Sequence, residues 1–262
     1  MEINTNGFVR CSYSTPDDIE HHRKMQALGI VKNLTDQHHP TLVEQVHAMK
    51  QQLEGMAAQQ YVQACLMVKL IANVLQHARL YYSFRRPAEL GKYRWIIDGK
   101  SASIGADRWE TWWSNFVCPI LESRSIKHPL GLIEGGRYEA EAKFSVEPSD
   151  WKKAALQVSC QDATLDLGRM VRDRIRFSPK PLFGLEAVDV MTNAIRRSLI
   201  GNLQRPGWIK IRNIMIHRSE HYIALTTLGP EINFAGARPY KHVLDDFTRG
   251  GRTMLPEHHQ WS

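Results

Sequence analysis

Close cysteine pairs are missing from this 262-residue chain, which has only four cysteines. Cys11, Cys65, Cys118 and Cys160 are too far apart in sequence to resemble the paired ligands of a zinc site. The His-Glu-x-x-His pattern of zinc hydrolases is also absent, and the segment HRSEH at 217–221 joins two strand-like runs, which favours a turn. We therefore expect the cysteines to be reduced, structural thiols. We do not expect the protein to be a zinc hydrolase.

Long hydrophobic runs are missing too. An uninterrupted apolar run such as ACLMV at 64–68 is far shorter than the roughly 20 residues that cross a bilayer. The amino-terminal residues lack the basic-then-apolar pattern of a signal peptide. These absences predict a cytoplasmic protein that is not inserted in a membrane.

Two common catalytic signatures are absent as well. GLIEGG at 131–136 lacks the Gly-Lys-Ser/Thr ending of a phosphate loop, and no Gly-x-Ser-x-Gly elbow occurs. The chain does have an excess of positive charge, formally +7. Such a surface attracts polyanions, so nucleic acid is the favoured partner, although many basic proteins bind none.

The apolar periodicity alternates between helix and strand spacing, which predicts one α/β domain with a loosely ordered tail from about residue 236. Pro16, Asp17 and Asp18 are typical of a helix start. Further helices are predicted over 41–54, 57–82, 107–124 and 183–201, with Trp109, Trp113, Phe116 and Ile120 on one face of the third. Strands are predicted at 7–15, 93–99, 129–136, 173–177, 207–217 and 222–225.

Acidic residues occur at the ends of two of these predicted strands and near the start of one helix. Asp98 ends WIID before a glycine, and Glu134 stands in the corresponding place after LGLI. Glu186 and Asp189 lie three residues apart in the predicted helix over 183–201, with Asp189 at the edge of its apolar stripe. Carboxylates of this kind can hold Mg²⁺ or Mn²⁺, which prefer oxygen ligands.

A structural explanation for the helical acids stays open beside the catalytic one. Glu186 can simply favour the positive end of the helix, and Asp189 can pair with Arg196 or Lys180. From the spacing alone this explanation is the more frequent one. The positions of Asp98 and Glu134 at the ends of predicted strands are the reason to favour a metal site.

Basic residues gather just before and within the same region. Strand alternation predicts that Arg172, Arg174 and Arg176 share one face, and Lys180, Arg196 and Arg197 follow nearby in sequence. A solvated charged face and a phosphate-binding surface explain this pattern equally well.

Three sequence segments together resemble an uncharacterised bacterial family, the domain of unknown function 3800. They are WIIDGK, CPILESRSIKHPLGLIEGG, and GLEAVDVMTNAIRR followed by GNLQRPGW, within residues 60–220. The most specific part is GLxxxDxxxNAIRR. The resemblance implies a ribonuclease-H-like mixed sheet with flanking helices and a late Gln-x-x-Asp motif, in which Asp189 takes the aspartate position and Glu186 the glutamine position. Asp98 corresponds less directly to a strand-end aspartate of such a sheet.

The chain departs from that family at its beginning. The family has an acidic pair on an early strand, whereas GFVRCSYST at 7–15 contains no acid. Either the first strand is missing or replaced, or this chain has lost the ligands that the strand supplies.

The sequence thus predicts a Mg²⁺- or Mn²⁺-dependent nuclease with an impaired site. In it, Asp98, Asp189 and Glu186 act in catalysis, Asp98, Asp189 and Glu134 bind metal, and the six basic residues bind nucleic acid. The alternative is a catalytically inactive nucleic-acid-binding or regulatory module of the same fold, working with a protein partner or a second copy of the chain.

Overall fold

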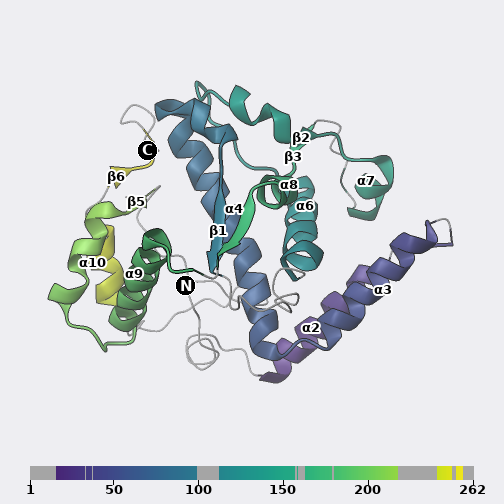
Figure 1. Ribbon diagram of the computed structural model, residues 1–262, viewed down its shortest axis with the longest axis horizontal. Helices are drawn as coiled ribbons and strands as arrows, with labels where there is room; N and C mark the ends of the chain where they lie inside the picture. Colours follow the sequence, from purple (N-terminus) through teal and green to yellow (C-terminus); the bar gives the residue numbers. More distant parts are fainter. Residues whose placement is uncertain are drawn as a thin grey trace.

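The computed structural model describes residues 16–32, 34–36, 38–98, 112–156, 158, 163–178, 180–217, 241–249 and 252–255. Helices dominate these residues (Figure 1). The α-helices are α2 (Pro16–Val31), α3 (Pro40–Glu54), α4 (Ala58–Arg85), α6 (Cys118–Lys127), α7 (Asp150–Leu156), α8 (Leu167–Arg172), α9 (Phe183–Leu199) and α10 (Lys241–Thr248). The strands are β1 (Trp95–Asp98), β2 (Ser145–Val146), β3 (Thr164–Leu165), β4 (Ile175–Ser178), β5 (Ile216–His217) and β6 (Arg252–Thr253).

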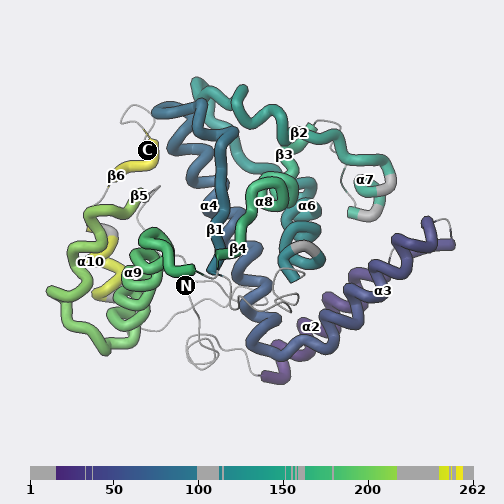
Figure 2. The backbone as a smooth tube through the Cα atoms, viewed as in Figure 1, coloured from purple at the N-terminus to yellow at the C-terminus, as the bar shows by residue number. Residues whose placement is uncertain are grey.

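Helices α2 and α3 contact each other and form a hairpin at the amino-terminal end of α4 (Figure 2). Proline stands at the first position of α3, and the ring of His39 accepts a hydrogen bond from the amide of Thr41. Asp17 and Asp18 lie in the first turn of α2, as the sequence predicts. The predictions of helices beginning at Pro16 and spanning 41–54 and 57–82 are confirmed.

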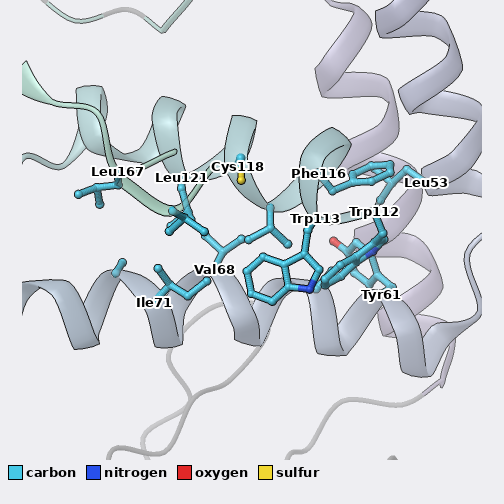
Figure 3. Close-up of a cluster of buried hydrophobic side chains, with 14 of the residues drawn as sticks. Leu53, Tyr61, Val68, Ile71, Trp112, Trp113, Phe116, Cys118, Leu121 and Leu167 are labelled. Carbon is cyan, nitrogen blue, oxygen red and sulfur yellow. The ribbon is translucent and has the colours of Figure 1, made fainter. Parts of the chain in front are cut away.

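The main hydrophobic core lies between α4 and the helical segment that runs from η2 (Trp113–Val117) into α6 (Figure 3). Trp113 and Phe116 are almost fully buried there, as predicted, whereas Ile120 is 41% exposed. The reason is that η2 is a π-helical turn, which holds more residues per turn than an α-helix and so rotates the later positions. Leu121 therefore takes the buried position that we predicted for Ile120. Trp109 lies outside the described residues.

A buried ion pair fixes the carboxyl-terminal half of α4. The Nε atom of Arg79 donates to Oε1 of Glu141 at 2.5 Å, and the two side chains are 9% and 2% exposed. The same guanidinium donates to the carbonyl of Leu130 at 2.7 Å and lies over the ring of Tyr138, 4.7 Å from its centroid. Burial raises the pKa of Glu141, and the charge of Arg79 offsets part of that rise. Arg79 thereby joins α4 to the loop at 128–138 and to η3 (Glu139–Phe144).

The short helix η1 (Pro87–Gly91) leads from α4 to β1 and packs directly on η3. A Cβ atom built on Gly91 would lie 2.4 Å from the carbonyl oxygen of Ala140, so only glycine allows this approach. Lys143 donates to the carbonyl of Gly91 at 2.6 Å. The position at which β1 begins therefore depends on η3.

The predicted strand at 129–136 is wrong. These residues form no strand, because side chains of α4 bind the backbone groups that a strand would use. Gln76 accepts from the amide of Gly131 at 2.8 Å, and Arg79 takes the carbonyl of Leu130.

Strands β1 and β4 pair in parallel, with Trp95 opposite Ile175 and Asp98 opposite Ser178. Their alternate side chains Trp95, Ile97, Ile175 and Phe177 pack against the main core, so this face is covered. The predicted strands at 93–99 and 173–177 are confirmed with slightly different bounds. The described residues thus agree with the α/β class in its coarse form.

The larger ribonuclease-H-like mixed sheet stays a prediction. Within the described part of the chain, the sheets β1–β4, β2–β3 and β5–β6 have two strands each. The predicted strands at 7–15 and 222–225 lie outside the described residues.

A second cluster forms where α9 meets η5 (Ile209–Ile214) and α10. Trp208 and Phe247 are buried there, with ring centroids 4.9 Å apart, and Arg205 pairs with Asp246 at 2.7 Å. The predicted strand over 207–217 is therefore mostly wrong, since only Ile216 and His217 are in a strand.

The loosely ordered tail from about residue 236 stays a prediction, and part of that region is described. Helix α10 contributes buried side chains to the second cluster. Met254 and Leu255 are buried against Leu80 of α4, where Arg85 donates to the carbonyl of Met254 at 2.5 Å.

Among the described helices, including the 28-residue α4, none has an apolar stretch that could span a bilayer.

Replacing Arg79 by methionine tests the importance of the buried ion pair. The substitution leaves the Glu141 carboxylate buried without its cation, which we expect to lower the free energy of unfolding by about 3–5 kcal/mol. The double variant Arg79→Met/Glu141→Leu removes both charges and should recover most of that loss. Urea denaturation measures both effects.

The matched control is Arg169→Met, which breaks the exposed pair between Arg169 and Asp173. It should change stability by less than about 1 kcal/mol. Equal losses for Arg79→Met and the control would contradict a structural role for the buried pair.

Candidate functional site

Asp98 is the last residue of β1 and is exposed. Parallel pairing places it beside Ser178, the last residue of β4. The carboxyl ends of the two strands therefore meet at one edge. In open α/β sheets this edge is where ligands commonly bind.

Helix α9 follows β4 closely and contacts β1. Figure 1 shows α9 and α10 on one side of β1 and helices α6 and α8 on the other. Glu186 lies in the first turn of α9 and Asp189 in the second, and both are exposed. Both acids therefore belong to a helix that contacts the strand ending in Asp98.

The apolar stripe of α9 is covered along only part of its length. Ile195 and Leu199 pack against the second cluster, as the stripe predicts, whereas Val188 is 55% exposed. Asp189 is therefore exposed. From the sequence we expect its side chain to lie partly against a core, and the structure differs. Because its carboxylate stays in water, no metal ion is needed to offset the burial of its charge.

Glu134 does not join the other candidate acids. Among the described residues, no three His, Cys, Asp or Glu side chains come together as metal ligands. Glu134 lies in the loop after α6, and its neighbour Ile133 packs against the carboxyl-terminal end of α4 near Leu80. The metal set of Asp98, Asp189 and Glu134 stays a prediction, but the strand end that placed Glu134 in it is not formed, because LGLI is not a strand.

The candidate acids make no ion pair with any described residue. This holds for Asp98, Glu186 and Asp189, and none of the nine ion pairs of the described residues includes Lys180 or Arg196. Arg196 instead donates to the side-chain oxygen of Asn193 at 3.0 Å. The predicted pairing of Asp189 with Lys180 or Arg196 is thus not formed, which leaves its carboxylate open to solvent.

The outer face of the β1–β4 sheet is basic. Arg176 is exposed in the middle of β4, opposite Ile96, which is 47% exposed. Arg174 precedes β4 in the same alternation and is also exposed, and its carbonyl accepts from the amide of Trp95 at 3.0 Å. Of the three arginines predicted to share one strand face, Arg174 and Arg176 follow the alternation of β4, whereas Arg172 lies in α8.

Arg94 belongs to the same face and was missed in the sequence analysis. It is exposed and directly precedes β1, two residues before Ile96. The alternation of YRWIID carries the signal, because it puts Arg94, Ile96 and Asp98 on one side.

The other predicted basic residues are exposed but have different positions. Arg172 ends α8 instead of lying in a strand. Burial raises the pKa of the Cys118 thiol, and the positive charge of Arg172 offsets part of that rise. Arg196 and Arg197 lie in the last turn of α9, where cations favour the helix dipole. Arg197 also donates to the carbonyl of Asn202 at 3.2 Å. These three residues have local roles that explain them without a ligand.

Two carboxylates fit the chemistry of Mg²⁺ better than that of zinc or calcium. Mg²⁺ keeps several of its waters and is commonly held by one or two carboxylates together with substrate phosphates. Asp98 and Asp189 supply oxygen ligands that are exposed and not engaged with any described cation. Two carboxylates would suffice for one hydrated ion if they lie close together, and the described residues hold no group of three such ligands.

Compared with models of known protein families, with curated proteins and with solved structures, the chain matches none of them. The resemblance to the domain of unknown function 3800 stays a prediction.

The geometry of the two acids can be tested directly. We expect the side-chain oxygens of Asp98 and Asp189 to lie within roughly 4–6 Å of each other, a range in which two carboxylates can share an ion. A crystal structure grown with Mn²⁺ should show anomalous density between them. Density elsewhere, or carboxylates on opposite sides of the sheet, would rule out a shared metal site.

Proposed function

We propose that the protein acts on nucleic acid at the carboxyl ends of β1 and β4, as a Mg²⁺- or Mn²⁺-dependent nuclease on a ribonuclease-H-like sheet. The observation that carries the proposal is the parallel pairing of the two strands. It puts Asp98 at the edge from which the chain continues into α9, and it puts Arg174 and Arg176 on the adjoining exposed face.

Each group has a distinct role in this proposal. Arg94, Arg174 and Arg176 hold backbone phosphates, which fixes the strand on the outer face. Asp98 and Asp189 hold the metal ion, and Glu186 orients its water ligands. The chemistry that a bound Mg²⁺ or Mn²⁺ supplies is activation of water and neutralisation of charge on the phosphate.

A second candidate is a nucleic-acid-binding module without catalysis. The specific observation in its favour is that the described residues include no group of three His, Cys, Asp or Glu side chains that could hold a metal. This candidate keeps the basic face and its phosphates but assigns no reaction to the acids. The two candidates share their ligand and differ in their response to metal.

Both candidate functions predict that the protein binds nucleic acid in a salt-dependent way. The protein should bind nucleic acid at low ionic strength and release it steeply as salt rises, because phosphate contacts release counterions. Arg174→Ala and Arg176→Ala should each reduce the slope of log K against log salt by about 0.7–0.9. Fluorescence anisotropy over a salt series measures the slope.

The matched control is Lys32→Ala, which removes one exposed charge just beyond the last residue of α2. It should leave the slope nearly unchanged. Binding that does not occur at low salt, or that ignores salt, would contradict the proposed ligand.

The enzymatic part predicts the effect of Asp189→Asn. The substitution keeps the volume of the side chain but removes the ligand charge, so it should abolish metal-dependent cleavage and leave stability unchanged. In the wild type, Mn²⁺ should raise the free energy of unfolding by about 2.7 kcal/mol at a hundredfold excess over its dissociation constant, and Asp189→Asn should lose most of this.

Glu134→Gln serves as the control, since Glu134 is exposed in the loop after α6 and does not end a strand. It should retain both cleavage and the Mn²⁺ effect. A thermal melt of the wild type that is indifferent to Mn²⁺ would favour the non-catalytic module.

A further inference from the structure

The first turn of α9 carries an aromatic side chain in solvent. Phe183 is 87% exposed, and Leu182 before it is 37% exposed. A Cβ atom built on Gly184 would meet no heavy atom within 4 Å, so the space beside this turn is open. Fully burying a phenylalanine side chain gains about 1.5–3 kcal/mol, so a ring left in water is a candidate contact for a partner.

The exposed ring lies on the same side of α9 as one of the candidate acids. Glu186 follows Phe183 by three residues, and Val190, which is 70% exposed, follows it by seven. Residues at these spacings are neighbours on a helix surface. Asp189 directly precedes Val190. Apolar side chains therefore border Glu186 and Asp189, the two helical acids of the proposed site.

The ring is also close in sequence to the basic face. Phe183 follows Ser178 by five residues, and Ser178 pairs with Asp98. Five residues of chain span at most roughly 17 Å, so the Cα atoms of Ser178 and Phe183 lie no farther apart than that. Exposed Lys180 lies between them. The contact of α9 with β1 keeps this helix next to the sheet. The cationic side chains and the aromatic ring thus belong to adjoining elements, β4 with its following segment and α9.

We infer that the protein binds single-stranded nucleic acid, with an unpaired base stacked on Phe183. This inference rests on the proposed function and specifies its substrate class. Proteins that bind single strands combine a basic surface for the backbone with aromatic rings for the bases. In a duplex both faces of a base are covered by its neighbours, so the ring of Phe183 finds a partner only in an unpaired strand.

The charges of this edge favour a polyanion over an apolar protein surface. Arg94, Arg174, Arg176 and Lys180 are exposed, and no described acid pairs with any of them. A second copy of the chain would bring the same positive charges against this edge. Self-association through α9 is therefore treated as an outcome of the test.

The experiment compares one 20-nucleotide sequence as a single strand and as a duplex, in Ca²⁺ so that binding is measured without cleavage. The wild type should bind the single strand more tightly. Phe183→Ala should weaken single-strand binding roughly 5- to 150-fold, the loss of one stacked base, and change duplex binding less than about twofold. Phe183→Trp should retain single-strand binding, because a larger ring stacks at least as well.

The matched control is Leu132→Ala, which truncates a 64% exposed leucine in the loop after α6. It should leave both affinities unchanged. Light scattering of the same variants reports their oligomeric state.

The outcomes separate the two claims. If the wild type binds neither form, the proposed function fails and this inference fails with it. If it binds nucleic acid but Phe183→Ala has no effect, only the inference is wrong. If Phe183→Ala changes the oligomeric state and not the affinity, α9 is a contact between copies of the chain, which also overturns the inference.

Discussion

The buried charge of Arg79 is the constraint on which the position of the candidate site depends. A guanidinium that is taken out of water must find acceptors, and Arg79 finds them in Glu141 and in the carbonyl of Leu130. Those acceptors fix η3 against α4. Because Gly91 packs on η3, the same contacts determine where β1 starts. One buried ion pair thus links a long helix, a loop and the strand that ends in Asp98.

Pairing of β1 with β4 then forms a small sheet with one covered face and one exposed face. The inner face of the pair is covered by the main core, so its outer face must carry residues that tolerate water. Arginines satisfy this requirement and also suit phosphate groups. The same pairing places Asp98 next to the start of the segment leading into α9. Helix α9 is then held mainly at its second half, by Ile195 and Leu199, which leaves its first two turns exposed beside the strand ends.

The sequence predicts the elements whose periodicity is strong and fails where other groups replace the expected hydrogen bonds. The helices from Pro16 and over 41–54 and 57–82 follow from apolar spacing and helix-start residues. LGLI reads as a strand, but Gln76 and Arg79, more than fifty residues earlier, bind its backbone. Glu134 belongs to the predicted site only because LGLI has the pattern of a strand. A non-local contact of this kind leaves no mark in a local pattern, whereas Arg94 could have been found from the alternation of YRWIID.

The central claim is that the outer face of β1–β4 and the first turns of α9 together form a nucleic-acid interface. Hydrogen–deuterium exchange of the full chain, with and without a single-stranded oligonucleotide, tests it most directly. The account predicts slower exchange in peptides covering 94–98 and 174–190 when the oligonucleotide is bound, and no change at 130–141, where Arg79 already holds the backbone. Protection confined to the α2–α3 hairpin or to 130–141 would contradict it.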